Sequence, residues 1–331
     1  MARFDSSPET FRVQEVPSYE PSGTGTHVYV LIEKRGLTTP EAIRALCTAV
    51  GVDPKDVGYA GMKDKHATTT QWLSFPEAAE AKLADVNIDK LRVISRSRHG
   101  NKLRVGHVRK NLFEVTLTDV SLEEQATLCD RFAALTEQGV ANRYGQQRFG
   151  RGDNVATGLA ILQGTRREKD RRKRTLLISA VQSAVFNQVL AWRQEQGSLR
   201  RVLGGDVLQK RETGGLFTSS DEVTDQGRLL AGELVTTGPL PGAKAPRPSE
   251  GSAADLLEQA AMAAVGLTPE LMAANARDLP GARRPLLMAV QASAPPVARG
   301  SELHLAFALP SGAYATVVID SLLGTSPAAP T

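Results

Sequence analysis

Several common signatures are missing from this 331-residue sequence. No run approaches the roughly 18 apolar residues that a membrane helix needs, so we expect no membrane partner. The first residues, MARFD, lack the apolar stretch of a signal peptide, and we therefore expect a cytoplasmic protein. The two cysteines, Cys47 and Cys129, are far apart and form no Cys-x-x-Cys pair. Their number and spacing argue against a disulfide framework and against a zinc site built from cysteines.

Motifs for metals and nucleotide cofactors are missing as well. The five histidines show no ligand-like spacing with Cys, Asp or Glu; they are His27, His66, His99, His107 and His304. There is no Gly-x-x-x-x-Gly-Lys-Ser/Thr loop and no convincing Gly-x-Gly-x-x-Gly, the usual signs of triphosphate hydrolysis and dinucleotide-dependent redox chemistry. No Gly-x-Ser-x-Gly turn indicates a Ser-His-Asp arrangement, although such an arrangement stays open. We therefore expect neither a metal nor a cofactor.

Positive charge, by contrast, is concentrated in two segments. The chain has 40 Lys and Arg against 36 Asp and Glu, a net charge of only +4. Residues 90–110 hold eight basic and no acidic residues, and residues 166–174 hold seven basic and two acidic ones. These segments together carry +13, whereas the other 25 basic and 34 acidic residues carry −9. One such segment could be a solvated face, but two on an otherwise acidic chain favour nucleic-acid binding.

The first 120 residues predict a mixture of strands and helices. β-Branched and aromatic residues predict a strand at 27–34. A Thr-x-x-Glu capping box with a proline in the first turn predicts a helix that starts at residues 38–41. A second capping box at 121–124 opens a helix toward residue 139. Further strands are predicted at 71–75, 91–95 and 113–118.

The middle of the chain has a different pattern. Helices are predicted at 154–162, 171–193 and 255–265. Gly- and Pro-rich connections, such as 237–242, separate them. After Pro295-Pro296, alternating apolar residues at 303–309, a turn at 310–312 and a β-branched run at 313–320 predict a hairpin.

An apolar hairpin of this kind is not stable alone, so we expect it to pair with the N-terminal strands. The middle would then be a domain inserted into a sheet-based one, with binding in the cleft between them. Residues 326–331 are expected to form a loose tail.

The segment Gly58–Trp72 has the highest density of chemically useful side chains. Two glycines precede Asp64, which stands between Lys63 and Lys65. Neighbouring cations favour the ionised carboxylate that a nucleophile or a general base needs. From the residue types alone, the alternative is a surface turn in which Asp64 caps a backbone group and the lysines are solvated.

Six collinear motifs, from about Phe11 to Ile319, resemble the TruD family of tRNA pseudouridine synthases. Gly58–Trp72 is similar to that family's Gly-x-Ala-Gly-x-Lys-Asp-Lys-His-Ala-x-Thr-x-Gln-Trp signature. The other similar stretches are Phe11–Glu15 with Pro21–His27, Lys110–Phe113, Asn142–Gly150, Arg171–Arg174 with Ser179-Ala180 and Phe186–Gln188, and Leu309–Thr316.

The resemblance implies an α+β pseudouridine synthase fold, a mostly antiparallel mixed sheet flanked by helices, with an inserted and largely helical TruD domain. Residues 1–138 and 289–331 would form the catalytic domain and residues 139–288 the insertion. The implied activity is isomerisation of a uridine in tRNA, expected at uridine 13, without a cofactor. Asp64 would be the catalytic aspartate, and Phe11, Asn111 and Tyr314 would contact the substrate.

Without the resemblance, each substrate-contacting residue has a plain structural explanation. Phe11 could be a core residue, Asn111 could end a turn, and Tyr314 could pack against the sheet. Basic residues of the two segments would grip the tRNA backbone from opposite sides of the cleft, with Asp64 at its base. The candidates for this contact are Arg96, Arg98, Lys102, Arg171, Arg172 and Arg174.

The chain departs from the family pattern at two positions. Tyr314 stands where the family usually has Phe, and Asp5 stands where it tends to have a Lys. If that lysine supports the catalytic aspartate, Arg3, Lys63 or Lys65 would have to replace it. A non-catalytic RNA-binding protein of the same fold is the alternative function. A different RNA-modifying enzyme, such as a methyltransferase, is a weaker third because no cofactor loop is found. We expect a monomer.

Overall fold

The computed structural model describes residues 1–84, 86–145, 148–150 and 153–325, and divides into two compact units. Unit 1 consists of Met1–Gln138 and Ala289–Gly324, and unit 2 contains Gly139–Met288. The predicted tail at 326–331 and residues 146 and 147 of the motif at 142–150 lie outside the described residues.

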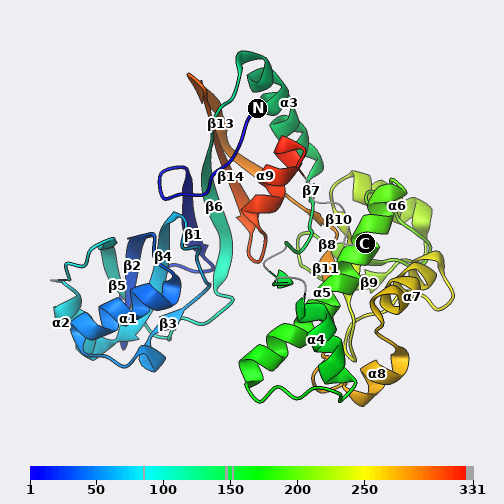
Figure 1. Cartoon of the computed structure of the whole chain (residues 1–331), viewed down its shortest axis with the longest axis horizontal. Helices are drawn as coiled ribbons and strands as arrows, with labels where there is room; N and C mark the ends of the chain where they lie inside the picture. Colours follow the sequence, from blue (N-terminus) through cyan, green and yellow to red (C-terminus); the bar gives the residue numbers. More distant parts are fainter. Residues whose placement is uncertain (85, 146–147, 151–152, 326–331) are drawn as a thin grey trace. The chain divides into compact units, whose positions relative to one another are not determined.

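Unit 1 contains strands from both ends of the chain (Figure 1). Its strands are β1 (Phe11–Pro17), β2 (His27–Arg35), β3 (Gly58–Tyr59), β4 (Thr68–Pro76), β5 (Leu91–His99), β6 (Val108–Leu117), β13 (Gln291–Arg299) and β14 (Glu302–Pro310). Its helices are α1 (Thr39–Val50), α2 (Glu80–Leu83), α3 (Leu122–Gln138) and α9 (Ala315–Leu323), with 3-10 turns at Pro54–Asp56 and Glu77–Ala79.

These strands form one eight-stranded sheet in the order β13-β14-β6-β1-β4-β2-β5, with β3 paired to β4. The pair β1–β4 is parallel, and the other pairs are antiparallel. The predicted fold class, a mostly antiparallel mixed sheet flanked by helices, is therefore confirmed.

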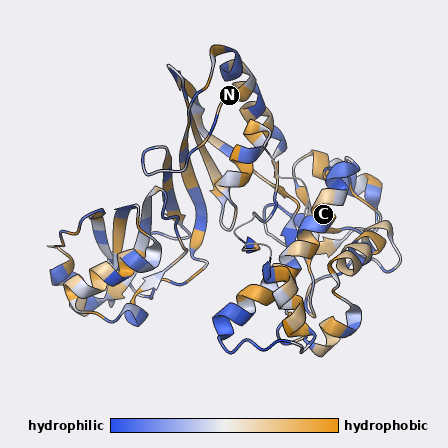
Figure 2. Cartoon of the chain, in the orientation of Figure 1, coloured by the Kyte–Doolittle hydropathy of each residue, from blue (hydrophilic) through white to orange (hydrophobic). Residues whose placement is uncertain are grey.

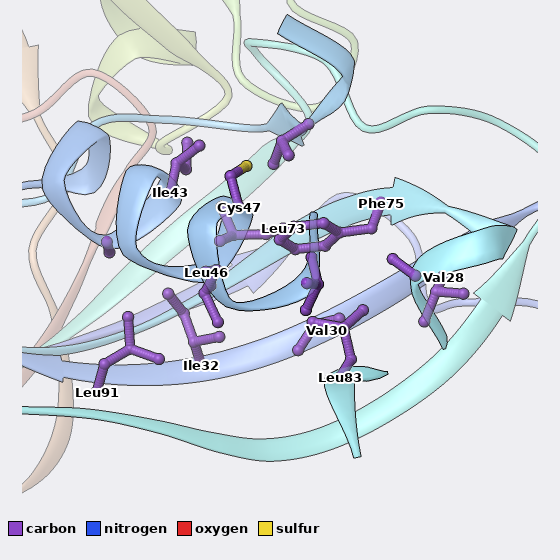
Figure 3. Packing of buried hydrophobic residues seen from close by; sticks show 14 residues of the cluster. Val28, Val30, Ile32, Ile43, Leu46, Cys47, Leu73, Phe75, Leu83 and Leu91 are labelled. Carbon is purple, nitrogen blue, oxygen red and sulfur yellow. The ribbon is translucent and has the colours of Figure 1, made fainter. Parts of the chain in front are cut away.

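Helix α1 forms as its sequence predicts. The side chain of Thr38 accepts a hydrogen bond from the backbone N–H of Glu41, and the Glu41 carboxylate accepts one from the backbone N–H of Thr38. Gly51 ends the helix with φ 75°. The buried stripe of α1 packs on β2 and β4 in one hydrophobic cluster, and Figure 3 shows Leu46 of α1 beside Ile32 of β2. Burial of each such side chain contributes about 1.5–3 kcal/mol.

The predicted C-terminal hairpin is wrong. Strand β14 pairs with β13, which precedes it, and residues 315–323 form α9 instead of a second strand. The buried residues of α9 recur at helical spacing; they are Ala315, Val318, Ile319 and Leu322. A stripe with this spacing lets the segment bury one helical face, and that burial outweighs the strand preference of its valines and isoleucine.

Unit 2 combines helices with short strands. Its helices are α4 (Asp153–Leu162), α5 (Arg171–Glu195), α6 (Glu222–Leu230), α7 (Ala253–Val265) and α8 (Pro269–Ala274). Its strands are β7 (Val140–Ala141), β8 (Val207–Lys210), β9 (Leu216–Thr218), β10 (Leu234–Leu240), β11 (Ala282–Pro285) and β12 (Leu287–Met288). The order β11-β10-β8-β9 makes a four-stranded sheet, which helical periodicity alone did not predict.

Most of the predicted connection at 237–242 is part of β10. Residues 234–236 pair with β8, whereas residues 237–240 pair with β11 alone among the strands that the structure describes. Pro239 therefore lies where one side of the strand needs no hydrogen-bond donor, which is where a sheet tolerates proline. Gly238 lies against Phe186 and Leu286, so a side chain at this position would collide with the core.

Helix α5 is long and apolar enough to meet a length-and-composition test for a membrane span, which the absence of an unbroken apolar run did not anticipate. However, 61% of the apolar window is buried inside the protein, as in a core helix. Figure 2 shows polar and apolar residues mixed along the helices and strands of both units. Arg193, near the end of α5, forms a buried ion pair with Asp206 at 2.8 Å.

Candidate active site

The segment Ala60–Ala67, between β3 and β4 in unit 1, contains Asp64 and is held by polar contacts to neighbouring elements. The backbone N–H of Lys63 donates to Thr39 Oγ1 (2.9 Å), and this hydroxyl donates to Gln71 Oε1 (2.8 Å). Gln71 Nε2 reaches the carbonyl of Gly61 at 3.4 Å. The first turn of α1 and strand β4 thus fix the conformation of the Asp64 segment.

A row of polar side chains crosses the sheet beneath this segment. Glu15 of β1 lies directly opposite Asn111 of β6, and the register of β1 with β4 places Gln71 on the other side of Glu15. Glu15 and Gln71 are buried, with 2% and 0% of their surface exposed. Buried polar groups of this kind require partners.

Lys63 is the partner of two side chains in this row, Glu15 and Asn111. Its ammonium lies 2.7 Å from Glu15 Oε2 and donates to Asn111 Oδ1 at 2.9 Å. The two charged side chains are 6% and 0% exposed. Burial raises the pKa of the Glu15 carboxyl, and the Lys63 cation partly opposes this shift. The signature segment is therefore attached to the sheet by a buried ion pair.

Asp64 itself is exposed at the surface of unit 1. Its Oδ1 accepts a hydrogen bond from the backbone N–H of His66 (3.1 Å), as in an Asx turn. Its main-chain carbonyl accepts a hydrogen bond from Lys34 Nζ (2.9 Å). The Asp64 carboxylate is thus open to solvent, while the Asp64 backbone is held in place by the buried ammonium of Lys34.

Lys34 is a site residue that the sequence analysis missed. It is 0% exposed, and its ammonium also donates to the carbonyl of Leu37 at 2.5 Å. Loss of hydration lowers the pKa of Lys34 to about 8, although the charge of Asp64 favours the protonated form. The available signal was strand alternation, because Lys34 is in phase with the core-facing Val30 and Ile32.

The three cations proposed to support Asp64 have other partners. Arg3 pairs with Asp119 (2.8 Å) and Asp5 (3.3 Å). Lys63 pairs with Glu15, as described above, and the ammonium of Lys65 lies 3.2 Å from a carboxylate oxygen of Glu41. Among the described residues, none of the three forms an ion pair with Asp64.

Of the predicted substrate contacts, Asn111 lies in the polar row, whereas Phe11 lies in an aromatic core. Phe11 is 5% exposed and stacks on Phe113, with ring centroids 6.0 Å apart. Tyr314 is half-buried and directly precedes α9 rather than lying in a strand. Within the described chain, the Asn111 amide oxygen is taken by Lys63, and no protein acceptor meets its NH₂ group.

The basic residues proposed for unit 1 already have contacts. Arg98 pairs with Glu77 (2.6 Å) and Glu80 (2.5 Å), so its charge is shared between both carboxylates. Arg96 donates to the carbonyl of Glu80 (3.2 Å), and Lys102 donates to that of Lys55 (2.8 Å).

Other basic side chains of the same segment have no ion-pair partner among the described residues, and one of them lies on a loop that contacts the Asp64 segment. Arg104 and Arg109 are exposed, and no carboxylate within the described residues pairs with either. The loop that carries Arg104 is fixed to the Asp64 segment, because the N–H of Gly106 donates to the carbonyl of Ala60 (2.9 Å). Gly58 of the signature permits this packing, since a side chain there would collide with the carbonyl of Leu103.

The second basic segment lies at the start of α5 in unit 2. Asp170 caps the helix by accepting from the N–H groups of Arg172 and Lys173. Arg174 pairs with Asp278 at 2.5 Å. Arg171 and Arg172 are exposed, and they have no ion-pair partner among the described residues.

Two pockets have linings that do not include Asp64. A pocket of about 480 Å³ in unit 2 is lined largely by proline, methionine and alanine around the Glu258–Arg283 ion pair. A pocket of about 310 Å³ in unit 1 includes Arg12, Glu114 and His304. No group of three or more His, Cys, Asp or Glu suited to a metal is found in the described part of the chain.

Comparison with known proteins identifies relatives along nearly the whole chain. The family model for tRNA pseudouridine synthase D (TruD) matches residues 2–169 and 167–322. A tRNA pseudouridine synthase D from Anaeromyxobacter sp. (strain Fw109-5) is 43% identical over 325 residues, covering 96% of this chain and 91% of the relative. One from Thermus thermophilus is 38% identical over 322 residues, covering 96% of this chain and 87% of the relative.

A solved structure shares the fold. The crystal structure assigned to tRNA pseudouridine synthase D from Methanosarcina mazei superposes with a TM-score of 0.74 at 22% identity, covering 98% of this chain and 93% of that one. Together, the family match and the relatives that span almost the full length show that this chain belongs to the tRNA pseudouridine synthase D (TruD) family.

Proposed function

We propose that this protein isomerises a uridine in tRNA, expected at uridine 13, to pseudouridine, with Asp64 as the catalytic carboxylate. Family membership supports the reaction class. The observation that carries the assignment of Asp64 is its combination of an exposed carboxylate with a backbone held by Lys34 and by the contacts of its neighbour Lys63. A catalytic group must be both accessible and held in one geometry.

The reaction requires little more than such a carboxylate. The bond between uracil N1 and ribose C1′ breaks, the base turns, and a bond forms between C1′ and uracil C5. C5 loses its proton and N1 gains one, so the product is an isomer of the substrate. No atom is added, and nothing is oxidised overall. Asp64 would attack the sugar, attack the base or take a sugar proton, and all three routes stay open.

The uridine must first leave its stack, which costs a few kcal/mol. We propose that Asn111 helps to offset this cost by donating its NH₂ group to a carbonyl of uracil. Lys63 can only donate hydrogen bonds, so its contact with the amide oxygen orients the NH₂ group away from itself. Tyr314 would stack on the base, whereas the burial of Phe11 and its stacking on Phe113 favour a supporting role in the core.

We assign the catalytic role to unit 1 and treat unit 2 as the inserted TruD domain. Contacts to the tRNA backbone are proposed for the exposed, unpaired Arg104 and Arg109 in unit 1 and for Arg171 and Arg172 in unit 2. That the two basic segments face each other across one cleft stays a prediction. So do a monomeric state, cytoplasmic localisation and the lack of a cofactor.

Incubation with an unmodified tRNA transcript, followed by pseudouridine mapping, tests the proposal. Asp64→Asn should abolish product while keeping tRNA affinity, because it removes the negative charge at nearly constant size. Asp53→Asn is the matched control, since Asp53 is an exposed aspartate that caps a short helical turn elsewhere in unit 1. Binding of tRNA without product from the wild type would support the alternative, a non-catalytic RNA-binding protein.

A further inference from the structure

Lys34 is unusual because a fully buried lysine has no carboxylate at ion-pair distance among the described residues. Its two acceptors are the main-chain carbonyls of Leu37, just before α1, and of Asp64. Removal of an ammonium from water is costly unless the protein replaces its hydration, and carbonyls replace only part of it. If this position had only a packing role, an apolar side chain, like those earlier in β2, would cost less free energy to bury.

The charged groups that act on Lys34 come from two neighbouring elements. Asp64 and Lys63 belong to the signature segment, and Glu41 belongs to α1. Lys63 and Glu41 are already paired, with Glu15 and Lys65 respectively. Asp64 is therefore the one of these groups without an ion-pair partner among the described residues, and Lys34 is the cation attached to its backbone.

We propose that Lys34 is a positioning residue for Asp64: its buried ammonium holds the Asp64 carbonyl and provides the fixed positive charge behind the carboxylate. The inference rests on the proposed function and concerns how its catalytic group is held. It also explains how the site can have Asp5 where the family tends to have a lysine. The supporting cation belongs to β2 rather than to the N-terminal segment. Lys34 touches neither substrate nor reacting atoms in this role.

The charge of Lys34 makes the proposal testable by pH. Its pKa is lowered from 10.5 to about 8, so activity that depends on the ammonium should fall as the pH rises through about 8. Folding stability should change in the opposite direction. The folded state binds the Lys34 proton more weakly than the unfolded state, so the cost of burying the charge disappears as the pH rises from 8 toward 10.5.

Single-turnover rates on an unmodified tRNA transcript, measured from about pH 6 to pH 10 with the urea midpoint at each pH, provide the test. Lys34→Met should lower the rate about 100-fold at neutral pH with tRNA affinity unchanged, and its residual rate should lack the alkaline decline. Lys34→Arg stays charged, so its decline should move upward by more than one pH unit. Lys82→Met is the control, because Lys82 also donates to a main-chain carbonyl but away from the site.

A wild-type rate from Lys34→Met would overturn the proposal. So would an alkaline decline that is identical in the wild type and in Lys34→Arg, because the titrating group would then be the substrate or another side chain. If Lys34→Arg does not fold, the pH profile of Lys34→Met is sufficient as the test. A fall in its residual rate at alkaline pH like that of the wild type would overturn the proposal. Absence of product from the wild type at every pH would instead refute the proposed function.

Discussion

Lys63 and Glu15 should be strongly coupled in the folded protein, because their charges are paired where almost no water reaches them. The side chains are 6% and 0% exposed, and the ammonium and carboxylate are 2.7 Å apart. Removing one partner of a buried pair leaves the other charge unpaired, which costs about 3–5 kcal/mol. We therefore expect Lys63→Met and Glu15→Gln each to lower the free energy of unfolding by several kcal/mol, with Glu15→Gln the milder.

The double variant should lose less than the sum of the single losses. Once both charges are gone, no isolated charge remains, so we expect a coupling energy of about 2–3 kcal/mol. The loss in Lys63→Met should also depend on pH. Burial raises the pKa of Glu15, so the lone carboxyl is neutral and tolerated at low pH and becomes costly as the pH rises through its folded pKa.

Urea unfolding followed by tryptophan fluorescence in a Trp192→Phe background measures these free energies of unfolding. Trp72 is then the only tryptophan in the sequence, and it reports on unit 1. The backbone N–H of Trp72 donates to Glu15 Oε1 at 3.3 Å, so the probe lies next to the pair. Arg35 and Glu9 are an exposed control pair at 2.7 Å, for which we expect at most about 1 kcal/mol. Single losses that add to within about 0.5 kcal/mol of the double loss would refute the reasoning.

Two further predictions follow from surface contacts. The double variant Arg104→Ala with Arg109→Ala should weaken tRNA binding and reduce the slope of log affinity against log salt by about 2. The double variant Arg96→Ala with Arg98→Ala should reduce this slope less. The reason is that Glu77 and Glu80 already neutralise the charge of Arg98. Equal slopes for the two double variants in filter binding would contradict this ranking. Thr38→Ala, which removes the cap of α1, should cost about 1 kcal/mol of unit 1 stability in the same urea assay; a loss below about 0.3 kcal/mol would show that water replaces the cap.

Local patterns predicted those parts of the fold that depend on neighbouring residues. The helix start at 38–41, the second capping box and the strand at 27–34 are all present, because caps and alternation act within one turn or one strand. The C-terminal hairpin failed at 313–320, where β-branched residues have helical spacing and bury one face of α9. Local strand propensity cannot anticipate which partner surface a segment will bury.

The candidate site divides in the same way. The sequence by itself determined the Asp64 segment and its likeness to a known signature, because those residues are contiguous. Only the tertiary structure decided that Lys63 serves Glu15 and Asn111 rather than Asp64, and that Lys34 holds the Asp64 backbone. Lys63 and Asn111 are 48 residues apart, and Lys34 and Asp64 are 30 apart. Such partners are set by strand order and register, which bring distant side chains onto one face of the sheet and expose or bury their charges.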